Sequence, residues 1–256
     1  MMYAICVVAA APLRKESSHR SEMTSQLLFG ETVQVLEEKE EWRRVKCRYD
    51  GYEGWVTYHL IEEISEVAAT APAPFVSTGL LNPVTLPDGL VNLPMGSSLT
   101  GFDEETRLLW DEKHKYHGTY RNTLTPHNDD LLWNALQPWM NAPYLWGGRT
   151  FMGVDCSGFV QTVFKVLGIR LQRDAYQQAV QGLPVEDLVL AITGDVAFFN
   201  NEAGKITHVG IVLNGDKIMH ASGRVRVDTL TKDGIFDKAG GKQTHQLHSI
   251  RRMVQV

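Results

Sequence analysis

The sequence predicts an α+β protein in which two small strand-rich regions precede a domain of helices packed on an antiparallel sheet. Three observations predict this class. Short runs of β-type residues separated by turn clusters fill residues 2–121. Two helical patterns follow between residues 125 and 168, and strand-like runs return from residue 195 onward.

Composition excludes several classes of protein. Of the 256 residues, 43% are hydrophobic and 21% are charged, which is ordinary for a soluble globular chain. The formal net charge of -5 gives no sign of a surface that binds a polyanion, so we expect no nucleic-acid partner. No apolar run is long enough to cross a bilayer, so we expect no membrane insertion.

The N-terminal segment, residues 3–11, is apolar enough to look like the core of a signal peptide. No lysine or arginine precedes it, and Arg14 and Lys15 follow closely, so we interpret it as the first buried strand. The expected location is therefore cytoplasmic. An exported protein is the alternative, if this N-terminus is that of a processed form.

The three cysteines form no framework, because their number is odd and their spacings match no zinc pattern. Cys6 and Cys47 lie in strand-like runs, and we interpret them as small core residues of a reduced protein. A disulfide between the two is the alternative.

Residues 1–65 are predicted to form a small β-barrel. The strand-like runs are YAICVVAA, QLLFGETVQVLEE, EWRRVKCRY and EGWVTY. Residues 66–75 have the composition of a linker. Residues 76–125 faintly repeat the first pattern and are interpreted as a second, degenerate barrel.

The last half, residues 126–256, is predicted to be the catalytic domain. Thr125 has the form of a helix N-cap, with Pro126 as the first helical residue. The apolar stripe of this helix is Leu131, Leu132, Ala135 and Trp139. After a second helix, the predicted strands are residues 195–200, 208–213, 217–222, 225–230 and 248–253.

The second helix carries the most informative residue, Cys156. Asp155 is a good N-cap, the apolar positions recur at helical spacing, and Gly168 stands where a C-cap belongs. A thiol at the start of a helix lies near the positive end of the helix dipole, which lowers its pKa and favours the nucleophilic thiolate. A lone buried cysteine is more often a core residue, so the functional reading needs a base within reach.

Two histidines on neighbouring predicted strands, His208 and His220, supply that base. Gly215 in the loop between them is suited to the left-handed position of a three-residue hairpin with a bulge. Val212 then pairs with Asp216, and His208 lies directly opposite His220 on the same face. We assign the remaining histidines to the surface or to structural roles: His19, His59, His114, His117, His127, His245 and His248.

Four motifs together resemble the NlpC-type cell-wall peptidases, a papain-like cysteine peptidase family. The motifs are PYLWGG with DCSGFVQ, then GDVAFF, THVGIVL and MHASG, and the resemblance covers residues 129–256. It implies a triad of Cys156 as nucleophile, His208 as general base and His220 as the residue that orients the base.

The architecture with two N-terminal SH3-like barrels resembles the γ-D-glutamyl-L-diamino acid endopeptidases of this family. The resemblance implies hydrolysis of the γ-D-glutamyl to L-diamino acid bond in murein peptides with a free N-terminal L-alanine. That chemistry needs neither a metal nor an organic cofactor. It leaves open whether the third residue is diaminopimelate or lysine.

The motif match also implies substrate contacts. Tyr144 and Trp146 line the site, Asp155 and Ser157 meet the substrate, and Asp155 suits the α-ammonium of L-alanine. Asp174 belongs to a family segment, Arg173-Asp174-Ala175, in which relatives often carry serine at the last position.

The first barrel is expected to form a wall that blocks longer peptides, and its candidates for the free amine are Glu22 and Tyr58. An exported hydrolase of intact peptidoglycan, with the barrels as wall-binding modules, is the alternative function. A third hypothesis is a binding protein with an inactive peptidase domain. Such a protein is expected to lack the cysteine or the base, and this sequence has both.

Overall fold

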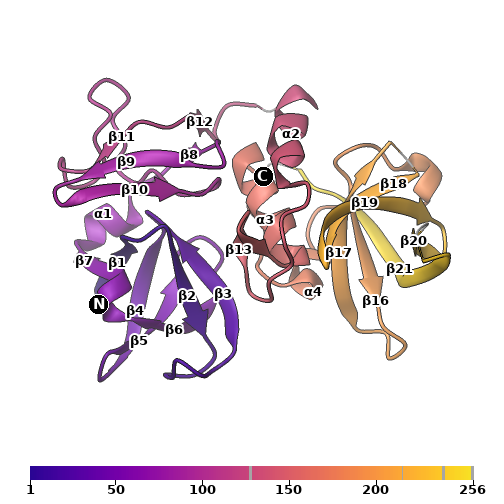
Figure 1. Ribbon diagram of the computed structural model, residues 1–256, viewed down its shortest axis with the longest axis horizontal. Coiled ribbons are helices and arrows are strands. Elements are labelled where there is room, and N and C mark those ends of the chain that lie inside the picture. The colour runs from indigo at the N-terminus through magenta and orange to yellow at the C-terminus, as the bar shows by residue number, and fades with distance from the viewer. Residues whose placement is uncertain (127–128, 215, 238–239, 255–256) are drawn as a thin grey trace.

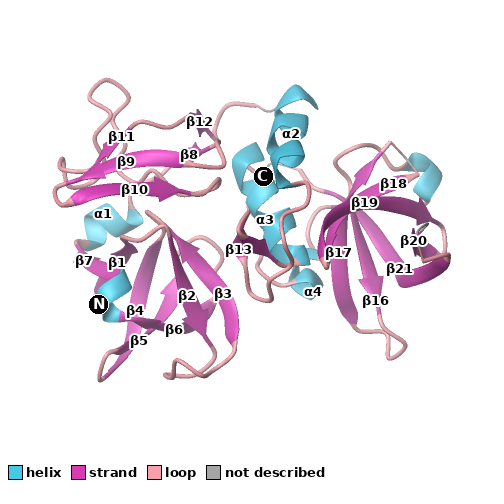
Figure 2. Cartoon of the chain, viewed as in Figure 1, coloured by secondary structure: helices cyan, strands magenta, loops and turns pink. Residues whose placement is uncertain are grey.

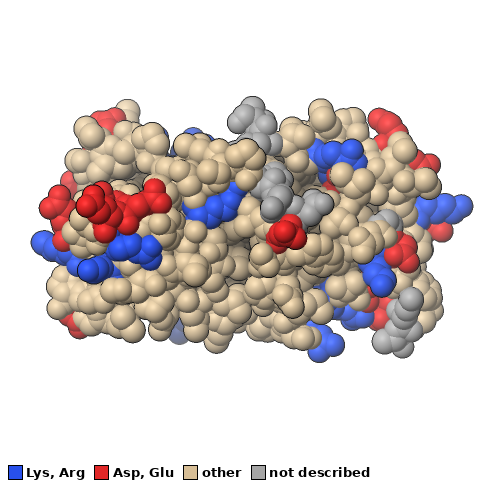
Figure 3. All heavy atoms as spheres, turned by 90° about the horizontal axis from the view of Figure 1, so that it is seen from above, with Lys and Arg blue, Asp and Glu red and all other residues tan. Residues whose placement is uncertain are grey.

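The computed structural model describes residues 1–126, 129–214, 216–237 and 240–254. Figure 1 shows a first sheet, a second group of strands above it, a group of helices in the middle and a large sheet at the other end. The longest helices stand at the centre, with strands on both sides (Figure 2). On the face shown in Figure 3, acidic and basic side chains are interspersed among uncharged ones. The predicted α+β class is confirmed.

Residues 1–65, which we call the first β-region, form one seven-stranded antiparallel sheet in the order β3-β2-β6-β5-β4-β1-β7. The elements are β1 (Met2–Cys6), β2 (Ala10–Arg14), β3 (Met23–Leu28), β4 (Thr32–Lys39), β5 (Trp42–Cys47), β6 (Glu53–Thr57), η1 (Tyr58–Leu60) and β7 (Ile61–Ile64). The single strand expected over residues 3–11 bends at residues 7–9 and becomes two. Cys6 and Cys47 are free and buried in the core, as predicted.

The predicted linker contains a short helix, α1 (Glu66–Thr70). The Ser65 hydroxyl caps it by accepting a hydrogen bond from the backbone N–H of Ala68 at 3.2 Å. Ala69 is buried, and its carbonyl accepts a hydrogen bond from the Thr32 hydroxyl at 3.1 Å. This segment is therefore packed on the first β-region.

Residues 75–122, the second β-region, form two small sheets, and no single seven-stranded sheet repeats here within the described residues. Their strands are β8 (Phe75–Ser77), β9 (Asn82–Leu86), β10 (Gly89–Leu93), β11 (Lys115–Tyr116) and β12 (Tyr120–Asn122). Their core surrounds Phe102 and Tyr116 and includes Phe29 from the first β-region. The two β-regions thus share buried apolar surface.

The central elements are α2 (Asp129–Leu136), η2 (Gln137–Trp139), β13 (Arg149–Thr150), β14 (Gly153–Val154), α3 (Cys156–Leu167) and α4 (Ala175–Gln178). The predicted start of the first helix is wrong: Pro126 is not helical, and the Thr125 hydroxyl donates to the carbonyl of Asn122 instead of capping. Residues 127–128 lie outside the described part of the chain. The buried stripe is confirmed at Leu132, Ala135 and Trp139. No helix in the described ranges is both long and apolar enough to span a membrane.

Helix α3 is the buried centre of the molecule, because every one of its residues is buried. It begins and ends as predicted. The Asp155 carboxylate accepts a hydrogen bond from the backbone N–H of Gly158 at 2.7 Å, and Gly168 ends the helix with φ of 84°.

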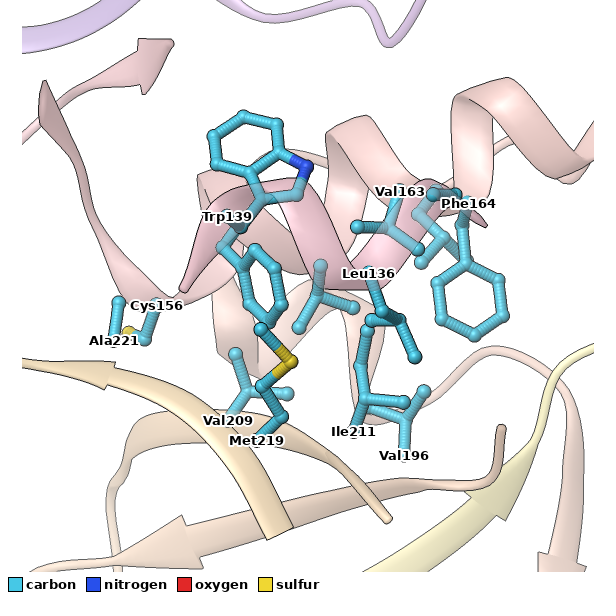
Figure 4. Close-up of a cluster of buried hydrophobic side chains, with 14 of the residues drawn as sticks. Leu136, Trp139, Cys156, Val163, Phe164, Val196, Val209, Ile211, Met219 and Ala221 are labelled. Carbon is cyan, nitrogen blue, oxygen red and sulfur yellow. The ribbon is translucent and has the colours of Figure 1, made fainter. Parts of the chain in front are cut away.

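The large sheet has the order β15-β21-β16-β17-β18-β19-β20, and β21 also pairs with β20, which closes one end. Its elements are β15 (Leu183–Val185), η3 (Leu188–Leu190), β16 (Val196–Asn200), β17 (Ile206–Leu213), β18 (Lys217–Ser222), β19 (Arg224–Thr231), β20 (Gly234–Asp237) and β21 (Lys242–Arg252). All five predicted strands are present, whereas β15 and β20 were not predicted. One face packs on the helices through residues such as Val209 and Ile211 (Figure 4), and the other encloses a second core around Val212 and Ile218.

Candidate active site

Cys156 lies at the first turn of α3, in the main core cluster that also includes Ala221 of β18 (Figure 4). Burial, and after it the Asp155 carboxylate, raises the pKa of the Cys156 thiol to about 12, although Arg173 and the backbone N–H of Val209 act against this. The expectation of a thiolate favoured by the helix start is therefore wrong for the resting site. The thiol is protonated at neutral pH and needs a base.

The candidate base is His208, the residue before Val209, which begins a series of hydrogen-bonded side chains. His208 and His220 are buried, and Nε2 of His208 lies 2.8 Å from Nδ1 of His220. Nε2 of His220 lies 3.0 Å from Oδ2 of Asp228 on β19. Asp228 in turn accepts a hydrogen bond from Arg226 at 2.8 Å through its other oxygen.

This series of hydrogen bonds determines which ring nitrogens of His208 and His220 carry protons. A carboxylate can only accept, so Nε2 of His220 donates to Asp228, and Nδ1 of the neutral His220 ring is an acceptor. Nε2 of His208 then donates to His220, which leaves Nδ1 of His208 unprotonated and basic. Burial, and then the neighbouring His220 and His245, lowers the pKa of His208 well below its ordinary value, so the ring is a neutral base at pH 7.

The loop between the two histidine strands has an odd number of residues, as predicted, and the histidines share a face. The register differs from the prediction by two residues, since Leu213 pairs with Lys217 and Gly210 lies opposite His220. His208 is thus a diagonal neighbour of His220, and a Cβ added at Gly210 would lie 2.8 Å from the Cβ of His220. Gly215 itself lies outside the described residues.

A third ring, His245 on β21, was assigned to the surface or to structure, but it stacks on His208. The ring centroids are 4.1 Å apart and the planes are inclined by 26°. Burial, and then His220, lowers the pKa of His245 to about 4, so it is neutral at pH 7. This packing limits rotation of the His208 ring.

Asp155 and Ser157 are buried beneath the site and paired with Arg173 of the segment before α4. Arg173 donates to both oxygens of Asp155, at 3.0 and 2.5 Å, and to the Ser157 hydroxyl at 2.8 Å. The same guanidinium donates to the Ser25 hydroxyl of the first β-region at 2.9 Å. Because Arg173 neutralises Asp155, this carboxylate supports the start of α3 and is poorly suited to the expected role of binding an ammonium group.

The loop of residues 144–149 joins the nucleophile to the first β-region. Burial, and then Cys156, raises the pKa of Tyr144 to about 12, which keeps its hydroxyl protonated beside the thiol. Trp146 donates through Nε1 to Glu22 at 2.8 Å. Gly147 has φ of 77°, and a Cβ there would lie 2.4 Å from the carbonyl oxygen of Met23, so only glycine allows this approach.

Asp174 and Tyr58, the remaining predicted site residues, lie in different surroundings. Asp174, just before α4, is half-buried, and burial raises its pKa despite the neighbouring Arg173. Burial, followed by the charge of Asp174, also raises the pKa of Tyr52, so this tyrosine of the first β-region lies within the electrostatic influence of that carboxylate. Tyr58 is 46% exposed, and its ring contacts His59 and Arg43.

No group of three or more His, Cys, Asp or Glu side chains in the described ranges is arranged to hold a metal ion. The arrangement that is present contains a protonated thiol at a helix start, a neutral imidazole base and a carboxylate at the end of the chain. It has the parts that nucleophilic catalysis by a cysteine requires.

Comparison with known proteins agrees with this geometry. Residues 141–241 match the model of the NlpC/P60 family, and residues 13–59 match the model of the bacterial dipeptidyl-peptidase SH3 domain. A γ-D-glutamyl-L-lysine dipeptidyl-peptidase of Bacillus subtilis is 30% identical over 234 residues, which are 84% of this chain and 78% of that protein. The chain belongs to the NlpC/P60 family. It is a cysteine peptidase with an N-terminal SH3-like region.

Two further proteins extend the likeness to almost the whole chain. Dipeptidyl-peptidase 6 of Lysinibacillus sphaericus is 26% identical over 86% of this chain and 88% of its own length. The crystal structure of an NlpC/P60 family protein from Bacillus cereus has a TM-score of 0.81, with 20% identity and coverage of 98% of this chain and 99% of the other. The second likeness shows that the fold extends over both β-regions and the peptidase domain.

Sequence reasoning missed four residues of this NlpC/P60 site: Asp228, Arg173, Tyr52 and His245. Asp228 had a weak signal, because an aspartate in the predicted strand VRVDTL follows the strand that carries His220. Arg173 was seen only as part of a family segment. Tyr52 and His245 lie beside the site only through tertiary contacts, and no spacing in the sequence marks them.

Proposed function

We propose that this cysteine peptidase hydrolyses the γ-D-glutamyl to L-diamino acid bond of murein peptides with a free N-terminal L-alanine, and releases L-Ala-γ-D-Glu. We also propose that Cys156, His208 and His220 act as its catalytic triad on a papain-like domain, with residues 76–125 as a second, degenerate SH3-like barrel. The relatives that match over most of the chain are named as dipeptidyl-peptidases, which supports this substrate class.

One observation carries the proposal. The first β-region is hydrogen-bonded to the loop of residues 146–149 and to Arg173, which supports the start of the nucleophile helix. Glu22 bonds Trp146, Gln26 accepts from the backbone N–H of Arg149 at 2.7 Å, and Ser25 accepts from Arg173. A wall in this position limits how much peptide fits before the scissile bond. An enzyme with such a wall removes a short N-terminal unit rather than cutting within a long chain.

The charges at this wall favour a free amine. With Asp155 neutralised by Arg173, Asp174 and Glu22 are two further carboxylates on this side. The charge of Asp174 acts on Tyr52, whose hydroxyl is a further polar group of the first β-region. We assign the α-ammonium of L-alanine to this group of side chains, in place of Asp155 and Tyr58.

The reaction follows from the protonation states of the site. Nδ1 of His208 accepts the Cys156 proton as the sulfur attacks the γ-glutamyl carbonyl. Backbone N–H groups at the start of α3 stabilise the oxyanion. Protonated His208 gives its proton to the departing amine, and water then hydrolyses the thioester, again with His208 as the base. His220 and Asp228 stabilise the positive ring.

The test is to identify the products from L-Ala-γ-D-Glu-L-Lys and from its diaminopimelate counterpart by mass spectrometry. We expect L-Ala-γ-D-Glu and the free diamino acid, and no reaction with Cys156→Ala. Release of free alanine, or no hydrolysis of either peptide, would contradict the proposal. Solubilisation of intact sacculi at a comparable rate would favour an exported hydrolase of intact peptidoglycan instead.

A further inference from the structure

Three register irregularities interrupt the strand pairing at the end of the large sheet next to His208. Thr207 is the extra residue between the pairs Phe199–His208 and Asn200–Ile206. In the same way Thr244 is extra on β21 against β20, and His248 is extra on β21 against β16. Bulges bend strand ends and re-aim side chains, and they recur beside active sites.

These strand ends surround a polar pocket of about 360 Å³, which we call the mouth pocket. Its walls include the amide side chains of Asn200, Asn201 and Gln243, together with Thr207, Glu202 and His245. His245 stacks on His208, so the mouth pocket shares a wall with the general base.

Chemistry places the leaving group on this side of the site. The nitrogen of the departing residue takes its proton from His208, so that residue must lie against His208. The first β-region, in contrast, meets the loop of residues 146–149 and Arg173, where we assign the amine end of the substrate. The mouth pocket is thus positioned to receive the residue on the leaving side of the scissile bond.

The mouth pocket carries one formal charge among its described lining residues, the carboxylate of Glu202. Glu202 takes part in none of the ion pairs found among the described residues. His245 is neutral at pH 7, because burial lowers its pKa to about 4. Such a pocket suits a flexible side chain that ends in an ammonium group.

We propose that the mouth pocket binds the side chain of the departing L-diamino acid, with Glu202 as the counter-charge of its terminal ammonium group. The inference rests on the proposed function, since it assumes cleavage before a diamino acid. It assigns a specificity residue that no sequence motif marks.

The experiment compares L-Ala-γ-D-Glu-L-Lys with L-Ala-γ-D-Glu-L-norleucine, whose side chain has similar length and no amine. We expect the wild type to prefer the lysine peptide by about fivefold in kcat/KM, as for an exposed charge pair. Glu202→Gln should remove this preference by lowering kcat/KM for the lysine peptide alone. The preference should also weaken as salt is raised.

Glu186→Gln is the matched control, because Glu186 is an exposed glutamate of the same domain outside the mouth pocket. Glu186→Gln should change kcat/KM for neither the lysine peptide nor the norleucine peptide. Equal kcat/KM of the wild type for both peptides, or a Glu202→Gln variant that affects both peptides alike, would overturn the assignment while leaving the proposed function intact. Failure of the wild type to cut either peptide at the γ-glutamyl bond would instead overturn the proposed function.

Discussion

Both β-regions contact the middle or far part of helix α3, but the first β-region also reaches the segments that support its nucleophile end. The first β-region reaches the nucleophile end through Ser25 and the loop of residues 146–149. The second β-region meets the far end, where Arg121 donates to the carbonyl of Val166 at 2.8 Å and Ser98 accepts from Lys165 at 3.0 Å. From this difference we infer separate roles: the first β-region shapes the site, and the second supports the fold.

A buried ion cluster joins the first β-region to the peptidase domain. Of the changes that compare the two β-regions, we expect its disruption to have the largest effect on stability. Glu31 accepts from Arg149 at 2.8 and 2.9 Å and from Lys165 at 2.6 Å, and all three side chains are buried. Glu31→Gln leaves two cations without their partner and should lower the free energy of unfolding by about 3–5 kcal/mol. Denaturant titration measures this value.

Glu53→Gln is the control for this variant. Glu53 pairs with Arg44 at 2.8 Å in the same β-region, but both side chains are exposed. Its loss should cost less than about 1 kcal/mol. Similar costs for the two variants would show that the buried cluster does not hold the first β-region in place.

The same cluster should make stability depend on acid. Burial alone would raise the pKa of Glu31, but Arg149 and Lys165 outweigh it and lower the pKa to about 2 from an ordinary 4.5. A depressed folded-state pKa means that the contribution is complete above pH 4.5 and is lost as the pH falls toward 2. The stability difference between wild type and Glu31→Gln should shrink through this window, and a difference that stays constant would contradict the assignment.

Two glycines allow a direct comparison of the β-regions. Gly147 faces Met23 of the first β-region, and Gly96 of the second faces Thr162 of α3, where an added Cβ would lie 2.7 Å from Thr162 Cγ2. Both have positive φ, so alanine should cost about 1–3 kcal/mol at either position. Only Gly147→Ala should also weaken discrimination between free and N-blocked peptides, as measured by kcat/KM. Equal loss of discrimination in both variants would end the proposed division of roles.

The smallest effect should come from Glu22, whose carboxylate accepts from Trp146 at the rim of the site. Glutamine still accepts that bond, so Glu22→Gln tests the charge alone and should raise KM for a free-amine peptide up to about fivefold. Glu104 of the second β-region accepts from the Tyr120 hydroxyl at 2.9 Å, and Glu104→Gln should leave KM unchanged. A rise in KM with Glu104→Gln, or none with Glu22→Gln, would remove Glu22 from amine recognition.

Local patterns predicted much of the fold. The start and end of α3 follow from Asp155 and Gly168, whose capping chemistry is local. The face shared by His208 and His220 follows from the period of a strand and an odd loop. The register does not, because pairing was predicted from one loop residue while the sheet is set by many cross-strand contacts.

Contacts between distant segments explain most of what the sequence did not predict. Asp155 looked like a substrate ligand because its pairing with Arg173 is not visible in the motif. Tyr58 was chosen for its place just after Gly54-Trp55, whereas the influence of Asp174 on Tyr52 arises from tertiary contacts that the sequence does not mark. The raised pKa of Cys156 arises from burial, which a helix-start argument leaves out.

The central claim is that the first β-region makes this NlpC/P60 peptidase act from a free N-terminal amine. The most direct test is the ratio of kcat/KM for L-Ala-γ-D-Glu-L-Lys to that for its N-acetylated form. The account predicts a ratio of at least about thirty, because acetylation removes a charge that is paired in a partly buried site. Equal values for the two peptides would contradict it.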